Sequence, residues 1–353
     1  MRIDIAPVRC FAELGRTWRA FEAETPGLSF FQSWTWVGCL AEERYDDPVL
    51  LRAEADGRLL GMALFNRRGG RLCLAEAGEP GLDAPFVEHN APLLAAGAGP
   101  EVLAALLGAA WRVPGVRRLV LSGAPPAVVD ATKGVPLRRQ ERQAPFVDLD
   151  AVRAAGGDWL PMLSANTRYQ LRRSARRYAE RGPLALARAK TSVEALAWLD
   201  ALVALHGKTW RARGLPGAFA TPYLLRFHQA LVLRALARDE LDLLRITAGG
   251  EVVGYLYNFR MHGRVYAYQS GLDHASAGPH EKPGLTCHAM AIERALREGE
   301  RIYDFLGGAD RYKVSFASAC APLLWVEMVP PRSLLGGAVR LWRLAGRPCA
   351  SLG

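Results

Sequence analysis

Short stretches in which apolar and polar residues alternate occur in two groups of three along this chain. The first group reads PVLLRAEA, RLLGMALF and RLCLAEAG, and the second reads LDLLRITA, EVVGYLYNF and RVYAYQSGLD. Turns that contain glycine separate the members of each group. Alternation between such turns predicts antiparallel strands. Each half of the chain is therefore expected to contain a three-stranded meander.

The two meanders align without a gap when the first is shifted by 193 positions. Six of the 22 aligned positions are then identical. These pairs are Gly57 with Gly250, Gly61 with Gly254, Arg67 with Arg260, Gly70 with Gly263, Arg71 with Arg264, and Gly78 with Gly271. Backbone geometry alone can fix turn glycines, so similar hairpins in unrelated segments are the alternative. We favour a duplication, which predicts two similar α/β domains.

Apolar residues at helical spacing, bounded by capping residues, glycine or proline, predict helices around the meanders. They cover residues 11–24, 33–43, 100–112, 164–182, 193–210, 222–238 and 284–298. Further strands are expected at 117–122, at 184–189, around 303 and at 322–330, whereas 124–145 is expected to be irregular. This order predicts a mixed α/β fold with a first domain over 1–150, a second over 151–330 and a basic, apolar tail over 331–353.

Composition narrows the class of protein. Of the 353 residues, 50% are hydrophobic and 23% charged, as in ordinary globular proteins. The apolar runs are too short for a membrane span and the start lacks the order of a signal peptide, so we expect a cytoplasmic protein without an integral membrane segment. Cysteines without C-x-x-C and histidines without H-E-x-x-H predict neither disulfides nor a metal. The net charge of +10 favours polyanionic partners, such as nucleic acid, anionic lipid or the phosphates of coenzyme A.

Five segments carry a resemblance to a known family. They are FFQSWTW, LSANTRYQLRRSARRYAERG, LHGKTWRARG, YAYQSGLD and IYDFLGGADRYKVSF. They resemble the tandem-domain GNAT acyltransferases, which include the cellulose-biosynthesis-associated acetyltransferases and are related to the Fem aminoacyl transferases. The resemblance covers nearly the whole chain and implies two GNAT domains, each a twisted mixed sheet flanked by helices. It also implies an acyl donor that lies where two neighbouring strands separate, with its pyrophosphate at the start of the next helix.

The helix predicted over 284–298 starts where this resemblance places the donor phosphates. Its first backbone N–H groups have no partner within the helix and lie at the positive end of the helix dipole. Lys282, Gly284, Leu285 and Thr286 are therefore the predicted donor-binding residues. The alternative is an ordinary surface loop before a core helix. The usual glycine-rich turn of the family is reduced to Pro-Gly-Leu here and is absent from the first half, whose domain is expected to be a scaffold or to face the acceptor.

Amide formation needs a base for the amine, an acid for the leaving group and donors for the oxyanion. Asp304, between two large apolar residues, is predicted to act as base or to anchor the amine. The alternative is a structural carboxylate paired with Lys313 or Arg311. The resemblance implies that Tyr312 protonates the leaving thiolate, against the alternative of a tyrosine packed on the sheet. Tyr268, near the end of its strand, is a third catalytic candidate.

Residues near the same strand end are candidates for acceptor binding. Gln269 and Asp273 lie at the end of the third strand of the second meander, and Lys313 can bind a carboxylate of the acceptor. Trp210, on the preceding helical segment, is the fourth candidate.

The helix predicted over 164–182 has a broad basic face. Its arginines are residues 168, 172, 173, 176, 177 and 181, opposite Leu171, Ala175 and Tyr178. Such a face is usually solvated, but it can also bind a polyanion such as a tRNA acceptor stem or anionic lipid. No groove-reading motif accompanies it, so DNA binding is not expected. The tail over 331–353 can touch a membrane surface or pack on the second domain.

Together these features predict an N-acyltransferase that moves an acyl group from acyl-CoA to an amine of a small molecule or peptide by direct attack. One alternative is aminoacyl transfer from an aminoacyl-tRNA held by the basic helix over 168–181, as in the Fem relatives. The other is a non-catalytic assembly module in polysaccharide or envelope biosynthesis.

Overall fold

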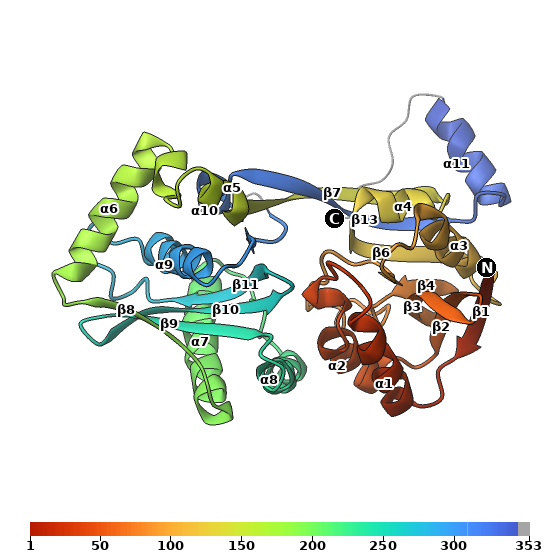
Figure 1. Ribbon diagram of the computed structural model, residues 1–353, viewed down its shortest axis with the longest axis horizontal. Coiled ribbons are helices and arrows are strands. Elements are labelled where there is room, and N and C mark those ends of the chain that lie inside the picture. Colours follow the sequence, from red (N-terminus) through yellow and green to blue (C-terminus); the bar gives the residue numbers. More distant parts are fainter. Residues whose placement is uncertain (309, 345–353) are drawn as a thin grey trace. The chain divides into compact units, whose positions relative to one another are not determined.

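The computed structural model describes residues 1–308 and 310–344, which form two compact units (Figure 1). Unit 1 contains Met1–Arg142 and the described residues from Pro322 onward, and unit 2 contains Gln143–Ala321. The chain enters unit 2 within one strand, β7, and returns to unit 1 within another, β13. The sheet of each unit therefore includes a strand that begins in the other.

Unit 1 is a mixed sheet with helices on both faces (Figure 1). Its strands, in sheet order, are β1 (Arg2–Pro7), β2 (Pro48–Ala55), β3 (Arg58–Arg68), β4 (Arg71–Leu74), β6 (Arg118–Ala124) and β13 (Ala319–Val329), and β5 (Leu93–Leu94) pairs with β3. Helices α3 (Pro100–Ala110) and α4 (Pro126–Ala131) cover one face, and α1 (Phe11–Glu22) and α2 (Trp34–Arg44) cover the other, with a short 3-10 turn over Phe30–Gln32. The pair β4–β6 is parallel, whereas the neighbouring pairs are antiparallel.

Unit 2 repeats this plan. Its strands, in sheet order, are β7 (Val135–Asp148), β12 (Ile302–Asp304), β11 (Arg264–Leu272), β10 (Glu251–Met261), β9 (Leu241–Ala248) and β8 (Leu184–Arg188). One face is covered by α6 (Ala165–Ala179) and α9 (Pro283–Arg297), with the short helices α5 (Leu149–Ala154) and α10 (Arg311–Phe316) and a 3-10 turn over Leu160–Met162 beside them. The other face is covered by α7 (Ser192–Ala212) and α8 (Pro222–Leu236).

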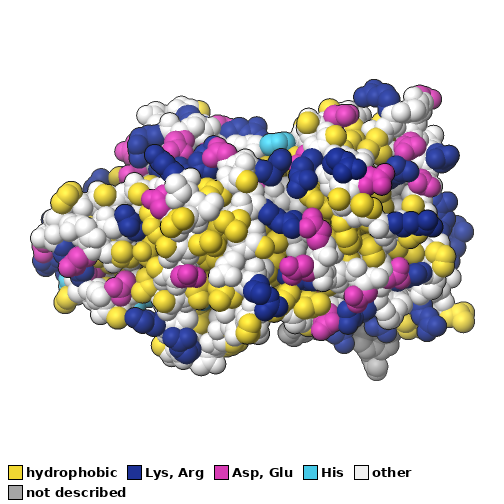
Figure 2. All heavy atoms as spheres, turned by 90° about the horizontal axis from the view of Figure 1, so that it is seen from below, with side chains coloured by type: hydrophobic (Ala, Val, Ile, Leu, Met, Phe, Trp, Pro, Cys, Tyr) yellow, Lys and Arg dark blue, Asp and Glu magenta, His cyan; other side chains and the backbone are white. Residues whose placement is uncertain are grey.

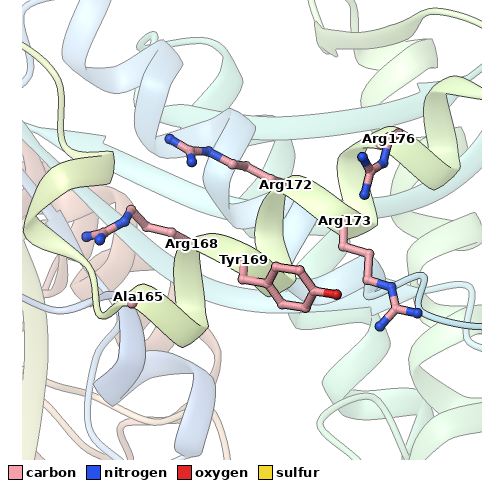
Figure 3. A pocket seen from close by; sticks show the side chains of 6 residues that line it. All are labelled: Ala165, Arg168, Tyr169, Arg172, Arg173 and Arg176. Atoms are coloured by element: carbon pink, nitrogen blue, oxygen red, sulfur yellow. The ribbon is translucent and has the colours of Figure 1, made fainter.

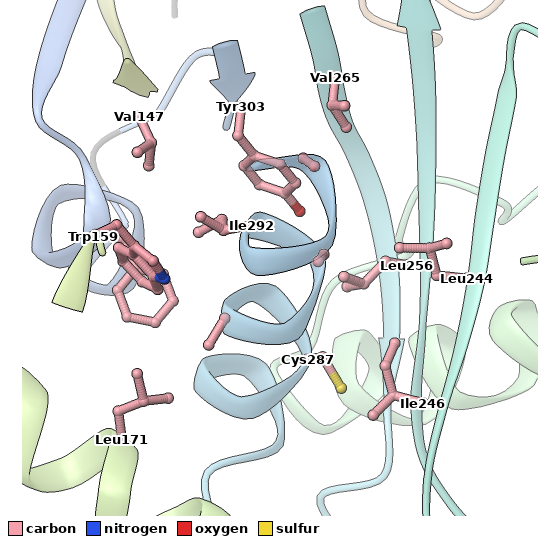
Figure 4. Packing of buried hydrophobic residues seen from close by; sticks show 14 of the residues in the cluster. Val147, Trp159, Leu171, Leu244, Ile246, Leu256, Val265, Cys287, Ile292 and Tyr303 are labelled. Carbon is pink, nitrogen blue, oxygen red and sulfur yellow. The ribbon is translucent and has the colours of Figure 1, made fainter. Parts of the chain in front are cut away.

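The core of unit 2 lies between α9, α6 and the sheet. Cys287 and Ile292 of α9 are fully buried, and Figure 4 shows them between the central strands and Trp159. Leu171 and Tyr178 of α6 join the same cluster. The apolar stripes of both helices therefore face the core, as expected of amphipathic helices on a sheet.

The backbone of the two meanders repeats at the predicted offset. Adding 193 to the bounds of β2 and β3 gives those of β9 and β10. Both hairpins also carry a β-bulge at equivalent residues, Leu60 in one and Val253 in the other. Their turns adopt the same left-handed conformation, with φ of 76° at Gly70 and 77° at Gly263. A bulge is a local feature that two unrelated hairpins would not be expected to share at one offset, so the structure supports the duplication.

Two parts of the predicted layout differ from the structure. Residues 124–145, expected to be irregular, contain α4 and most of β7. The strand escaped prediction because its middle, from 138 to 143, is polar and buries no side chain. Residues 322–329, assigned to the second domain, instead pair with β6 of unit 1.

Helix α11 (Leu334–Leu344) belongs to unit 1, where Gly336 lies against Pro330 and Val135. The expected packing of the tail on the second domain is therefore not found for this helix. Leu334 on its outer side is 97% exposed. The last part of the predicted tail, 345–353, lies outside the described residues.

Candidate functional site

Two parallel strands of unit 2 separate after only three residue pairs. β11 and β12 pair from Arg264 with Ile302 to Tyr266 with Asp304. Leu306 then adopts a left-handed conformation, with φ of 60°, and the chain turns away. β11 itself continues to Leu272, paired with β10, and carries a bulge at Tyr268. We call this point the strand separation; beyond it, the β12 side of β11 has no strand partner within residues 1–308 and 310–344.

The loop after β11 leads to the N-terminus of α9, which is fastened to α6. Ser174 of α6 accepts a hydrogen bond from the Lys282 backbone N–H at 2.8 Å, and its hydroxyl bonds to that of Thr286 at 2.8 Å. Arg181 pairs with Glu281 in the same loop. Thr286 is buried and so holds the helix start in place.

Positive charge surrounds this helix start. Desolvation and the charges of Arg173, Arg177 and Lys282 lower the pKa of His280, which places these four residues close together. Gly284 lies next to Leu272 at the end of β11, where an added Cβ would come within 3.3 Å. The free N–H groups of the first turn therefore lie beside the strand end in a cationic setting, an arrangement that suits an anion.

A chain of buried polar side chains runs beneath α9, and the sequence analysis missed it. Asp242 of β9 accepts from Arg294 at 2.6 Å and from Asn258 of β10 at 3.3 Å. The Asn258 side chain is hydrogen-bonded to Tyr303, and the Tyr303 hydroxyl is 2.9 Å from Nδ1 of His288. We call Asp242, Asn258, Tyr303 and His288 the buried polar chain. A single histidine within an apolar helix was the only sequence signal for it.

Tyr312, the predicted acid, lies against the end of this chain. Its ring stacks on His288, with centroids 5.2 Å apart and planes 22° apart. Burial, followed by the charge of Asp310, raises its pKa, so the phenol stays protonated at neutral pH. Lys313 donates to the Gly307 carbonyl at 3.2 Å, and its charge acts on His288.

Asp304, the predicted base, lies on the opposite face of the sheet from Tyr312. It pairs with Arg264 at 2.9 Å and accepts from the Leu306 N–H at 2.7 Å. The structural alternative named Lys313 or Arg311 as its partner, and the structure replaces both with Arg264. Alternation along β12 causes this placement: Tyr303 points toward α9, so the next residue points toward α7 and α8.

The remaining candidates lie around β11 on the side of α7 and α8, or in the loop. Tyr268 packs against His228 of α8 at 5.8 Å. Trp210 lies over His206 of α7 at 5.5 Å, and His206 bonds to the carbonyl of Ser270 at 3.0 Å. His206 thus reaches the strand that carries the separation, a contact that no motif revealed.

Gln269 is half-buried beside the bulge, opposite Tyr257 of β10. Asp273 accepts from the N–H groups of Ala275 and Ser276, so it shapes the loop. Leu285 packs partly against the core.

Unit 1 fills the equivalent point with an inserted loop. The pairs Gly61 with Leu94 and Gly254 with Leu272 are equivalent, so residues 75–92 interrupt the strand that is continuous as β11. Gly78 lies in this insertion, and its predicted match with Gly271 is therefore coincidental. Asn90 bridges the two strand ends: its side chain donates to Leu74 of β4 at 3.0 Å, and its backbone N–H donates to Gly123 of β6 at 3.1 Å.

The insertion also buries two carboxyl groups. Burial, together with the charge of Asp83, raises the pKa of Glu76 to about 8, against the lowering effect of the Ser122 hydroxyl that donates to it at 2.6 Å. Asp83 accepts from the N–H groups of Ala77, Gly78 and Glu79, which closes the loop on itself. The insertion is thus held by its own hydrogen bonds.

The exposed side of α6 carries a shallow hollow of about 410 Å³, lined by Ala165, Arg168, Tyr169, Arg172, Arg173 and Arg176 (Figure 3). Tyr169 is 59% exposed, and Arg173 lies over its ring at 5.9 Å. Every residue that lines the hollow belongs to α6. On the face shown in Figure 2, by contrast, acidic and basic side chains are interspersed.

A strand pair that separates beside the start of a helix, together with cations at that start, defines an acyltransferase-type fold and site. Residues 165–314 match the family model described as acetyltransferase (GNAT) domain, so unit 2 contains a GNAT domain. No curated protein matches the chain. The cellulose-associated type within the resemblance stays a prediction.

Solved structures cover almost the whole chain. FemX aligns with a TM-score of 0.61 and 10% identity over 98% of this chain and 100% of its own. The L-PGS of Bacillus licheniformis aligns with 0.56 and 15% identity over 94% and 97%. The C-terminal domain of a putative lysylphosphatidylglycerol synthetase from Agrobacterium fabrum aligns with 0.55 and 12% identity over 95% and 96%. At these identities the likeness establishes the fold, which is that of two tandem GNAT domains.

Within the part of the chain that the structure describes, no group of three or more His, Cys, Asp or Glu side chains is arranged to hold a metal ion. In the same part, no helix has both the length and the apolar character that a membrane span requires.

Proposed function

We propose that this protein is an N-acyltransferase that transfers an acyl group from an acyl-CoA thioester to an amine. The observation that carries the proposal is the strand separation beside the N-terminus of α9. There the first N–H groups of the helix, with Lys282, Arg173 and Arg177 around them, can bind the donor's phosphates. The thioester then lies along the unpaired side of β11, whose backbone groups are free to hold it.

The side chains near this point suit direct attack by the amine. Tyr312 remains a protonated phenol and can give its proton to the departing thiolate. Asp304 is held by Arg264 on the far face, so we do not retain it as the base, and an amine that enters deprotonated needs none. Unit 1, whose equivalent point is filled by the insertion, serves as a scaffold or contributes to acceptor binding.

Isothermal titration with coenzyme A, acetyl-CoA and a longer acyl-CoA tests the donor. We expect the wild-type protein to bind, and Lys282→Glu to weaken binding by about tenfold, which corresponds to ~1.4 kcal/mol. Lys190→Glu is the matched control, because it changes the same charge on an exposed residue between β8 and α7. Absence of binding to all three ligands would refute the proposal.

A second candidate is aminoacyl transfer from an aminoacyl-tRNA, favoured by the hollow on α6. Four arginines and an exposed tyrosine line it, which suits an RNA backbone with an unstacked base. Two of the solved structures above are named as lysylphosphatidylglycerol synthetases, and the third is FemX. The double variant Arg172→Glu, Arg176→Glu separates the two candidates. It should abolish tRNA-dependent transfer and leave acyl-CoA binding within about twofold, because Arg173 and Arg177, not these two, lie by Lys282.

A further inference from the structure

The buried polar chain is an unusual feature of an apolar core. Asp242, Asn258, Tyr303 and His288 are each no more than 3% exposed, and they come from three strands and a helix. Burying such groups costs free energy unless each finds a hydrogen bond, and packed apolar side chains of similar size would stabilise a core at least as well. A function at the exposed end of the chain accounts for its presence.

The chain has a defined direction. Asp242 is paired with Arg294 and can only accept, so Asn258 turns its amide N–H groups toward it. The bond from Asn258 to Tyr303 lowers the pKa of that phenol, which identifies the amide as the donor. In agreement, Oδ1 of Asn258 has no hydrogen-bond partner among the described residues. Tyr303 therefore accepts from Asn258 and gives its own proton to Nδ1 of His288. This leaves the ring proton of His288 on Nε2.

His288 is also kept neutral. Burial, followed by the charge of Lys313, lowers its pKa to about 3. The titratable groups that face it are Tyr303, Tyr312 and Lys313, and the pKa of both tyrosines is raised. Such an imidazole is a poor base at neutral pH, but it is a fixed N–H donor that does not change its charge.

The histidine lies at the strand separation. Its ring contacts Phe305, which directly follows β12, at 5.5 Å, and it stacks on Tyr312. We infer that Nε2–H of His288 donates a hydrogen bond to the oxyanion formed during acyl transfer, and that Asp242, Asn258 and Tyr303 fix its tautomer. This inference rests on the proposed function.

The step balances as follows. The amine nitrogen forms a bond to the thioester carbonyl carbon, and the C=O electron pair moves to oxygen, which accepts from His288. When this intermediate collapses, the C–S bond breaks and the sulfur takes the proton of Tyr312. The proton lost by the amine nitrogen returns to Tyr312 through water. The products are an amide and a free thiol.

The activity test uses the full-length protein with acetyl-CoA and hydroxylamine, and follows the loss of thioester absorbance. Because removal of one oxyanion donor costs about 10² to 10³ in kcat, His288→Ala should lower kcat about 100-fold with little change in KM for acetyl-CoA. His288→Gln restores an N–H donor near Nε2 and should stay within about tenfold of wild type. The control is Tyr45→Phe in unit 1, which removes another buried hydroxyl, one without a hydrogen-bond partner in the described structure.

A structural readout separates this role from mere packing. Nuclear magnetic resonance of isotope-labelled histidine, assigned with His288→Gln, should show a neutral Nε2–H tautomer at about pH 5, where exposed histidines are protonated. Tyr303→Phe should lose this tautomer preference. If wild type turns over acetyl-CoA but His288→Ala retains kcat within about twofold, or if the proton is found on Nδ1, the inference is wrong and the proposed function stands. If wild type gives no turnover, the proposed function fails and the inference fails with it.

Discussion

The two units of this protein share a meander, a bulge and a three-pair parallel contact, yet they treat the end of that contact differently. In unit 2, β11 runs on past the strand separation toward the start of α9. In unit 1, the insertion over 75–92 interrupts the equivalent strand, and Asn90 ties β4 to β6. The strand geometry alone therefore does not make a site. What matters is whether the unpaired strand edge is left for a ligand or satisfied by the protein itself.

The same contrast holds for the charged groups beside each parallel pair. Arg264 and Arg71 are equivalent, but only Arg264 has a carboxylate, Asp304, on the neighbouring strand. Arg71 donates to the Gly78 carbonyl of the insertion. Duplicated backbones have thus acquired different polar interiors, and four changes test how far the units have diverged.

The largest effect is expected from removing the equivalent arginines. Arg264→Met leaves a fully buried carboxylate without its cation and should cost about 3 kcal/mol of unfolding free energy. Arg71→Met removes one hydrogen bond and should cost about 1 kcal/mol. Urea unfolding of both variants measures the difference. Equal losses would contradict the structural role given to Asp304.

Next in size is the loss of the proposed acid. Tyr312→Phe should lower kcat for acetyl-CoA and hydroxylamine about 100-fold with KM nearly unchanged. Because burial raises its pKa, activity should not decline through ionisation of this phenol below about pH 10. A variant with wild-type kcat would assign Tyr312 to packing.

A smaller effect, which depends on pH, belongs to unit 1. The pKa of Glu76 in the folded protein is about 8, above its usual 4.5, so the folded state binds its proton more tightly and loses stability as pH rises between these values. Glu76→Gln cannot ionise and should stabilise the protein by about 2 kcal/mol at pH 8.5, but hardly at pH 4.5. Thermal unfolding at both values measures this, with the more exposed Glu79→Gln as control. A gain that is the same at both pH values would rule out the titration of Glu76 as its cause.

The smallest effect concerns the bridge in unit 1. Asn90→Ala loses the bond to Leu74 and should cost about 1–2 kcal/mol, with faster hydrogen exchange in residues 75–92. Acyl transfer should stay within about twofold of wild type, because Asn90 lies in unit 1. The exposed Asn166→Ala serves as the control. A large loss of kcat would show that unit 1 takes part in the chemistry.

Much of the fold was predictable because its signals are local. The meanders follow from alternation and turn glycines, and α9 begins at Pro283, as a proline at a helix start indicates. Strand β7 was missed because an exposed polar strand has no apolar period. The candidate site was predictable in part: Tyr312 and the start of α9 were named, whereas His288 and His206 were not.

The sequence by itself determined the strands, the duplication and the basic face of α6, since each depends on residues within a short window. Only the tertiary structure decided which side chains meet. Strand alternation and the β11–β12 register placed Asp304 and Tyr312 on opposite faces of the sheet. Sheet order brought Asp242 and Asn258 under a helix that begins at Pro283, so that the chain they form ends at His288. Contacts of this kind depend on how distant segments pack, which no local pattern encodes.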